Sequence, residues 1–98
     1  MSARVAGERF KISSEVVARE LGGEAVLLDL ESGQYFGLDP VGSRIWTLLA
    51  QTPLTLAELA DRIEEEFDAP RARIESDLEA LIADLQAQGL IVTSAAAS

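Results

Sequence analysis

The stretch Ser32–Trp46 reads S-G-Q-Y-F-G-L-D-P-V-G-S-R-I-W, and its residue pattern changes in the middle. Gln34–Leu38 is short, contains two aromatic residues and lies between Gly33 and Pro40, which predicts a β-strand. Asp39 before a proline then predicts the start of a helix, because an acidic N-cap followed by proline at the first helical position is a helix-start signal. We therefore expect the functional site beside this junction, on the strand that precedes it.

Three helices are expected after the junction. The first covers residues 40–51 and carries Trp46, which we interpret as a core anchor rather than a platform for a ligand. Residues 55–58 form a T-x-x-E capping box, which predicts the start of the second helix. The third helix should begin with Pro70 at its first position and end before Gly89.

Before the junction, the sequence predicts an antiparallel meander of three strands. The strands are expected at 16–21, 24–30 and 34–38, and Gly22-Gly23 is a hairpin signal between the first two. Residues 8–12 can add a further short strand. The predicted fold class is therefore α+β: a small winged-helix-like domain, in which a three-stranded antiparallel β-meander is followed by three α-helices.

Alternation along the strands predicts which side chains face the core. The residues expected on the core face are Val26, Leu28, Leu30, Phe36 and Leu38. Tyr35 is expected on the opposite face, where it can pair with Leu27. Both surface packing and contact with a ligand remain open for Tyr35.

Composition restricts the possible functions. The chain has 98 residues, no cysteine and no histidine, so it lacks the commonest general base and the thiolate and imidazole metal ligands. We expect one domain over residues 1–98 with a core at about 8–92, a disordered tail at 93–98, no cofactor and no metal. Because neither a signal peptide nor a long apolar run is present, we expect a cytoplasmic protein without a membrane partner.

The charge pattern argues against nucleic acid. The net charge is −9; residues 1–50 hold five basic and seven acidic side chains (net −2), and residues 51–98 hold three and ten (net −7). Such a field repels a phosphate backbone. Arg71 and Arg73 lie in the first turn of the third helix, and they serve either a partner or ordinary pairing with Glu75 or Asp77.

The order of motifs resembles a known family. Residues 35–49 read Y-F-x-L-D-x-x-G-x-x-I-W-x-L-L; a T-x-x-E-L helix follows, and then a long acidic helix that ends in G-L-I. This set, spread over Val16–Val92, is similar to the pyrroloquinoline quinone biosynthesis protein D (PqqD) family, which belongs to the leader-peptide recognition domains of ribosomal peptide modification pathways. Most relatives carry Asn at the position of Asp39, and both residues cap helices well.

The resemblance implies a non-catalytic peptide-binding module. In the family, a leader peptide adds to the third strand of the meander and lies in a groove beside the third helix. Carried onto this chain, the implied site residues are Gln34, Tyr35, Phe36, Gly37, Leu38, Arg73, Ile74, Asp77, Leu78, Leu81 and Leu85. Periodicity does not separate the helix residues that face the peptide from those that face the core.

The resemblance also implies a second partner, a peptide-modifying enzyme that receives the bound precursor. Candidates are a radical S-adenosylmethionine enzyme, or a leader protease and cyclase in a lasso-peptide pathway. The alternative is a winged-helix-like dimerisation or regulatory module without a peptide substrate, because an open strand edge can also pair with a second copy and form a homodimer.

Overall fold

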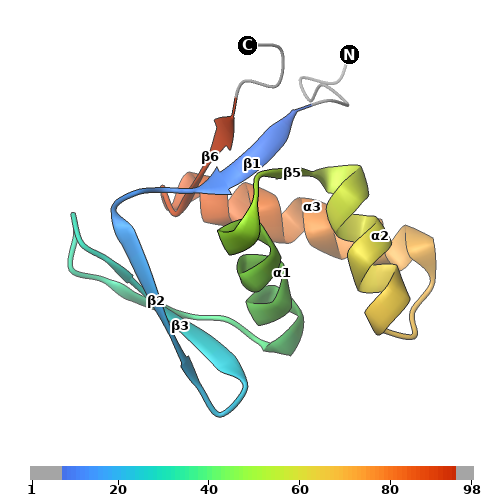
Figure 1. The fold of residues 1–98 in the computed structure, drawn as a ribbon, viewed down its shortest axis with the longest axis horizontal. Helices are drawn as coiled ribbons and strands as arrows, with labels where there is room; N and C mark the ends of the chain where they lie inside the picture. Colours follow the sequence, from blue (N-terminus) through green and yellow to red (C-terminus); the bar gives the residue numbers. More distant parts are fainter. Residues whose placement is uncertain (1–7, 95–98) are drawn as a thin grey trace.

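The computed structural model describes residues 8–94. The start of the chain and the end of the predicted tail, residues 95–98, lie outside the described residues. The elements in chain order are β1 (Arg9–Ile12), β2 (Val16–Leu21), β3 (Glu24–Asp29), β4 (Tyr35–Gly37), α1 (Pro40–Gln51), β5 (Leu54–Thr55), α2 (Leu56–Glu66), α3 (Arg71–Ala87) and β6 (Ile91–Ser94) (Figure 1). The predicted α+β class, with a meander before three helices, is confirmed.

The strands form two antiparallel sheets rather than one. The predicted meander has the order β2-β3-β4, and a second sheet has the order β5-β1-β6. The short strand expected at 8–12 exists as β1, but it pairs with β5 and β6, which the sequence did not predict. Thr93 and Ser94 pair with Phe10 and Arg9, so the disorder expected from residue 93 is wrong for these two residues. Their order comes from backbone partners more than 80 residues away, which no local pattern reveals.

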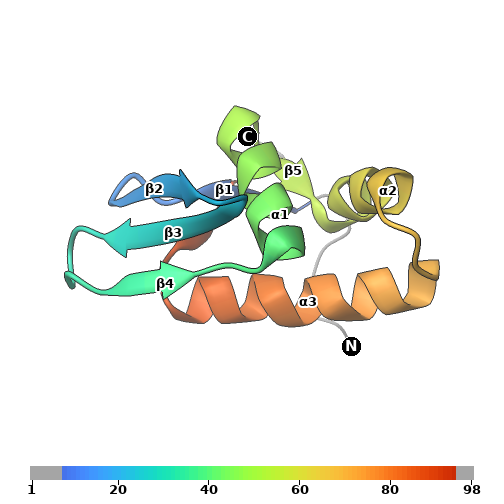
Figure 2. The ribbon, with the colours of Figure 1, turned by 90° about the horizontal axis from the view of Figure 1, so that it is seen from below.

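The hydrophobic core lies between the meander and the helices. Figure 2 shows α3 along one side of the domain, beside the meander, α1 and α2. Trp46 on α1 is 4% exposed and belongs to the same buried cluster as Leu27 on β3 and Ile82 on α3. The prediction that Trp46 anchors the core is confirmed.

The predicted core face of β3 is wrong. Ala25 and Leu27 are buried, whereas Val26 and Leu28 are half-buried and Leu30 is 55% exposed. The stretch from Ala25 to Leu30 is apolar at five of six positions, so alternation fits either face and the packing of α1 decides between them. The strand also ends at Asp29, which leaves Leu30 in a turn.

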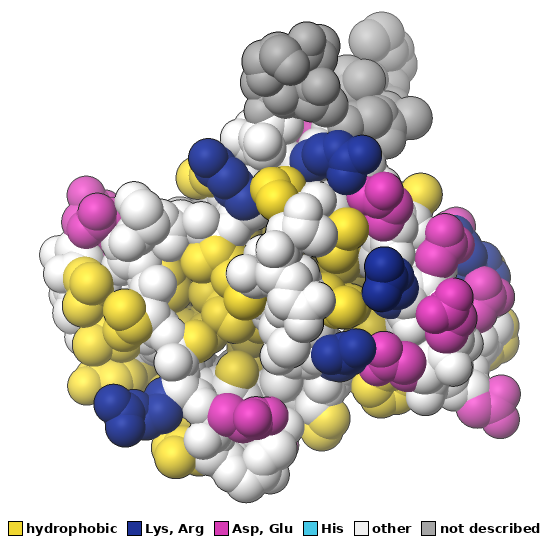
Figure 3. Space-filling view, viewed as in Figure 1, with side chains coloured by type: hydrophobic (Ala, Val, Ile, Leu, Met, Phe, Trp, Pro, Cys, Tyr) yellow, Lys and Arg dark blue, Asp and Glu magenta, His cyan; other side chains and the backbone are white. Residues whose placement is uncertain are grey.

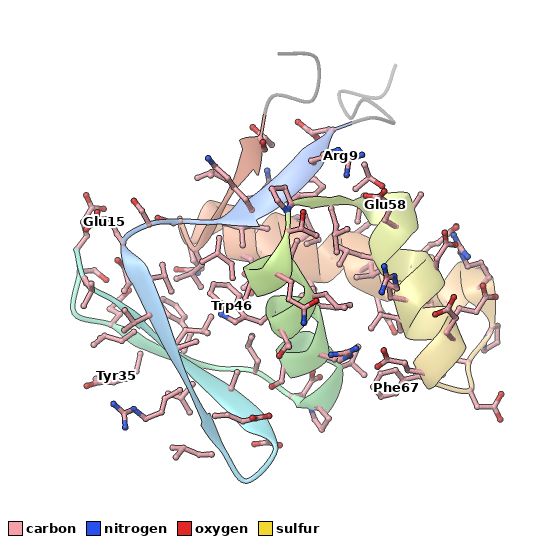
Figure 4. The ribbon with its side chains drawn as sticks, viewed as in Figure 1. Arg9, Glu15, Tyr35, Trp46, Glu58 and Phe67 are labelled. Atoms are coloured by element: carbon pink, nitrogen blue, oxygen red, sulfur yellow. The ribbon has the colours of Figure 1, made fainter. Side chains whose placement is uncertain are left out.

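The register between β3 and β4 agrees with Leu27 being on the buried face of the sheet. Leu27 lies opposite Phe36, and Tyr35 lies opposite Leu28 rather than Leu27. Phe36 is half-buried against the core and Leu38 is buried, as predicted. Tyr35 is 71% exposed and points away from α1 (Figure 4).

Hydrogen bonds hold the junction between β4 and α1. Asp39 caps α1 because its Oδ1 accepts a hydrogen bond from the Gly42 amide at 2.7 Å, and Pro40 is the first helical residue, as predicted. The buried Ser43 hydroxyl accepts from the Ala25 amide at 2.7 Å and donates to the Leu38 carbonyl at 3.2 Å. A Cβ at Gly42 would lie 3.2 Å from Asp39 Oδ1, so the cap requires a small residue there. The end of β4 is therefore fixed against β3 and α1.

The other helix boundaries follow local signals. Thr55 and Glu58 form the predicted capping box at the start of α2, with bonds of 2.9 and 3.1 Å. Pro70 is the N-cap of α3 rather than its first residue. After α3, Gly89 has φ +76°, a left-handed conformation that favours glycine and stops the helix.

Candidate functional site

The free edge of β4 is the first part of the site. In the sheet order β2-β3-β4, β4 is hydrogen-bonded to β3 alone. The Leu38 amide donates to Ala25, and the Gln34 carbonyl accepts from Asp29, so both groups point toward β3. Because backbone groups alternate in direction along a strand, those of Tyr35 and Gly37 point to the free edge. Figure 2 shows that this edge is the side of the meander nearest α3.

One hollow lies beside this edge and a second adjoins it along α3, and together we call them the groove. The first has a volume of about 200 Å³ and lies between β4 and the second half of α3. It is lined by Phe36, Gly37, Leu38, Asp39, Leu81, Asp84, Leu85, Gln88 and Leu90. The second has a volume of about 240 Å³ and lies among the start of α1, the end of α2 and the first half of α3. It is lined by Asp39, Val41, Gly42, Ile45, Ile63, Phe67, Ala69, Arg73, Ile74, Asp77, Leu78 and Leu81. Asp39 and Leu81 border both hollows.

The structure brings together nine of the eleven site residues implied by the sequence. The residues that line the first hollow are Phe36, Gly37, Leu38, Leu81 and Leu85. The residues that line the second are Arg73, Ile74, Asp77, Leu78 and, again, Leu81. Gln34 and Tyr35 line neither hollow, and the Tyr35 side chain is on the outer face of the sheet. Any contact of Tyr35 with a ligand in the groove would therefore use its backbone.

Burial separates the α3 residues that periodicity left together. Ile74, Leu78 and Leu85 are at most 5% exposed, so they form the floor of the groove and belong to the core. Leu81 is half-buried and packs against that core from the groove side. Leu81 is therefore the apolar side chain of α3 that a bound molecule would touch most directly.

Two groove residues, one in the last turn of α3 and one at its C-cap, were missed by the sequence analysis. Asp84 and Gln88 line the hollow beside β4. Together with Asp77 and Leu81 they stand at steps of four, three and four residues, which places all four on one helix face. Helical spacing counted from Leu81 would have predicted that Asp84 and Gln88 share its face. The spacing of the apolar residues alone predicts the buried positions of α3 instead.

The comparisons with known proteins agree with this geometry. The sequence model of the family described as coenzyme PQQ synthesis protein D (PqqD) matches residues 24–91. This chain belongs to the PqqD family. The match includes β4, α1, α2 and α3, so it covers every element that lines the groove of this PqqD-family chain. No curated protein sequence matches it.

Two solved structures are similar to this PqqD-family chain. One is TbiB1 in complex with the TbiA(beta) leader peptide, with 42% sequence identity, a TM-score of 0.78, and coverage of 83% of this chain and 93% of that chain. The other is a lasso peptide synthetase B1 complexed with the leader peptide, with 26% identity, a TM-score of 0.75, and coverage of 85% and 96%. Both structures are complexes with leader peptides.

The two arginines at the start of α3 differ in their pairing. Arg71 is bound to Asp61 at 2.8 Å, Glu64 at 2.9 Å and Glu75 at 2.9 Å, and these hydrogen bonds raise the pKa of its guanidinium. The expected pairing with Glu75 is therefore present, and Arg71 does not line the groove. Arg73 lies at 3.8 Å from Asp77, both side chains are more than 70% exposed, and both line the groove.

Neither a metal cluster nor a membrane span is found in the part of the chain that the structure describes. Within residues 8–94, no three side chains of His, Cys, Asp or Glu are grouped so that they could hold a metal ion. No helix among these residues is both long and apolar enough to cross a bilayer. The groove of this PqqD-family chain thus offers apolar surface, carboxylates and one guanidinium as its binding chemistry.

Proposed function

We propose that this PqqD-family chain is a non-catalytic binding protein that captures the leader of a ribosomally made precursor peptide and presents it to a separate modifying enzyme. The leader adds to β4 as a fourth strand of the meander and lies in the groove against α3. The observation that carries this proposal is the free edge of β4 beside the groove, in a chain similar to two proteins solved with leader peptides.

The backbone supplies the affinity in this mechanism. The amides and carbonyls of Tyr35 and Gly37 point to the free edge and form hydrogen bonds with the added strand. Each such bond contributes about 0.5–1.5 kcal/mol net. Exposed edges are normally protected by charges, prolines or bulges, and β4 has neither a charge nor a proline. An uncharged edge fits a strand that is covered when the protein works.

The side chains of the groove supply the selectivity. One face of an added strand points toward α3, so alternate side chains of the leader enter the groove. Leu81 stands where the two hollows meet, above the buried floor of Ile74, Leu78 and Leu85. We therefore expect the leader to place apolar side chains on both sides of Leu81.

The second partner is a peptide-modifying enzyme: a radical S-adenosylmethionine enzyme, or a leader protease and cyclase. A strand added at the edge of a sheet leaves the outer face uncovered. On that face, Val17, Leu28 and Tyr35 stand in register across the three strands, and Val17 and Tyr35 are exposed. Figure 3 shows hydrophobic side chains gathered over the meander, while charged side chains gather over α2. The absence of histidine and cysteine from the sequence agrees with a binding role rather than catalysis.

A homodimer formed through the same edge is the second candidate, because β4 is open to any extended chain. Nucleic acid is not an expected partner, since the net charge of −9 repels phosphate. A two-fold pairing of β4 with itself would bring two copies of Asp39 and of the α3 carboxylates together. This repulsion favours the peptide over the second copy.

Backbone amide resonances can test strand addition directly. We expect a panel of leader peptides that includes TbiA(beta) to shift the amides of residues 34–38 together with those of residues 77–88, and to leave residues 56–62 of α2 nearly unchanged. A joint response of two segments distant in sequence requires an occupant between them. Tight binding that shifts α2 alone would contradict the proposal. Concentration-dependent sedimentation without any peptide binding would favour the homodimer.

A further inference from the structure

The charges around the groove are unbalanced. In the part of the chain that the structure describes, three carboxylates line it, those of Asp39, Asp77 and Asp84, against one guanidinium, that of Arg73. Arg73 lies beside Asp77, at 3.8 Å, in the hollow farther from β4. Among residues 8–94, the charged residues that line the hollow beside β4 are Asp39 and Asp84, and no basic residue lines it. The part of the groove closest to the added strand is therefore both apolar and negatively charged.

Asp84 stands at an electrostatically unfavourable place. It lies in the last turn of α3, where the free carbonyls already carry partial negative charge, and this turn holds no basic residue. Among residues 8–94, the Asp84 carboxylate forms neither a side-chain hydrogen bond nor an ion pair. Asp61, Glu64 and Glu75, by contrast, all bind Arg71. Nothing in the described chain compensates the charge of Asp84.

Asp39 contributes from the opposite wall of the same hollow. Its Oδ1 accepts the capping hydrogen bond of the Gly42 amide, while Oδ2 has no hydrogen-bond partner among residues 8–94. Three arginines form ion pairs outside this hollow. Arg9 pairs with Glu58, Arg44 pairs with Glu66, and Arg71 pairs with three carboxylates. Among residues 8–94 no basic side chain lines this hollow, so a cation carried by the occupant would lie against Asp39 and Asp84 without a competing basic group from these residues.

We propose that the groove selects an extended peptide that carries a Lys or Arg side chain among its apolar side chains, with the cation placed against Asp84 and within reach of Asp39. This inference rests on the proposed function and adds the charge class of the ligand. Charge complementarity identifies the occupant: a cationic peptide relieves the repulsion in the hollow, whereas a second copy of this chain adds Asp39 and Asp84 again. The apolar lining supplies the attraction common to all candidates, and the carboxylates discriminate between them.

A displayed library of random 12-residue peptides tests the charge class without knowledge of the natural leader. The library is selected against four proteins: the wild-type chain, Asp84→Asn, Asp84→Lys, and Glu79→Gln as a matched control. Glu79 lies on the same helix, is exposed, and does not line either hollow. We expect Lys and Arg to be enriched near the apolar residues of peptides selected by the wild type and by Glu79→Gln. Asp84→Asn should lose the enrichment, and Asp84→Lys should select Asp and Glu instead.

A peptide from the wild-type selection then gives a quantitative test. Replacing its Lys by Gln should weaken binding to the wild type about three-fold, as for a partly exposed ion pair, and should have no effect on binding to Asp84→Asn. Tight binders without enriched cations would overturn this inference and leave the proposed peptide binding intact. If neither the library nor TbiA(beta) yields any binder to the folded wild type, the proposed function fails as well.

Discussion

The meander has two free edges, and only one of them is beside the groove. β4 is a three-residue strand without charges, and α3 lies along its open side with Leu81 and Asp84 (Figure 2). β2 is a six-residue strand whose residues after Val16 are all exposed, and it carries Arg19 and Glu20. The longer edge has more free backbone groups, yet no helix of residues 8–94 lies along its open side (Figure 2), and it carries protective charges.

This comparison indicates which features besides an open edge we expect a binding site to need. Both edges can form hydrogen bonds with an added strand. Each such bond replaces a hydrogen bond to water, so it contributes little net free energy to binding. A strand added at β4, as we propose, would also bury apolar side chains against α3, and burial contributes about 25 cal/mol per Å². We therefore expect α3 to make β4 the preferred edge, and each prediction below alters one part of this difference.

Removing the Trp46 side chain, which supports the strand between the two edges, should have the largest effect, and this effect is on the free energy of unfolding. Trp46 packs from α1 into the core that carries β3, the strand shared by β2 and β4. We expect Trp46→Ala to lower the free energy of unfolding by about 3–5 kcal/mol, because it leaves a large cavity. Denaturant unfolding measures this loss, and a change below about 1 kcal/mol would show that the core does not depend on Trp46.

A charge on the α3 side of the groove should remove the apolar contact that we expect to favour β4 over β2 as the binding edge. Leu81→Glu places a carboxylate on the half-buried wall of the groove, where desolvation disfavours it. We expect leader binding to weaken at least ten-fold, about 1.4 kcal/mol or more, while the melting curve remains native-like. Isothermal titration and thermal melts provide the two readouts.

Leu78→Glu is the contrasting variant, because Leu78 is 2% exposed and forms the floor. It should unfold the domain, since an unpaired charge in the core is strongly disfavoured. If Leu81→Glu unfolded the domain to the same extent, Leu81 would belong to the core and not to the wall of the groove.

Proline substitution compares the two edges directly. The amide of Gly37 points to the free edge of β4, and the amide of Ala18 points to the free edge of β2. Gly37→Pro removes one outward donor and should weaken leader binding about five-fold, whereas Ala18→Pro should leave it unchanged. Gly37→Ala is the matched control, because a Cβ at Gly37 meets no atom within 4 Å. Equal losses from both prolines would show that the leader does not distinguish the edges.

Acid should destabilise the corner of the second sheet where Glu58 binds Arg9. A hydrogen bond from the Thr55 amide, together with Arg9, lowers the pKa of Glu58 below its ordinary value of 4.5 (Figure 4). A lowered folded-state pKa contributes stability that is present above pH 4.5 and is lost as the pH falls through the folded value. We expect the melting temperature of Glu58→Gln to fall slightly less than that of the wild type between pH 6 and pH 3. Because the Glu58 side chain is 42% exposed, this is the smallest of the expected effects.

The sequence analysis predicted the parts of the site that depend on local signals. The end of β4 and the start of α1 follow from Asp39-Pro40, and the boundaries of α1 agree with the prediction. The resemblance to the PqqD family implied a groove between the strand and α3, and one of the two hollows lies there. It did not separate Leu81 from Leu78, because both positions fit an apolar stripe and only packing against α1 and α2 distinguishes wall from floor.

By itself, the sequence determined the helices, their caps, the meander and the acidic character, because each depends on residues close together in the chain. The tertiary structure alone decided three features: the buried face of β3, the sheet that β1 forms with β5 and β6, and the meeting of Asp39 with Asp84 in one hollow. These features join segments that are far apart in sequence. A strand that is apolar on both faces, or a carboxylate on an exposed helix face, has the same local pattern whichever neighbour the fold brings to it.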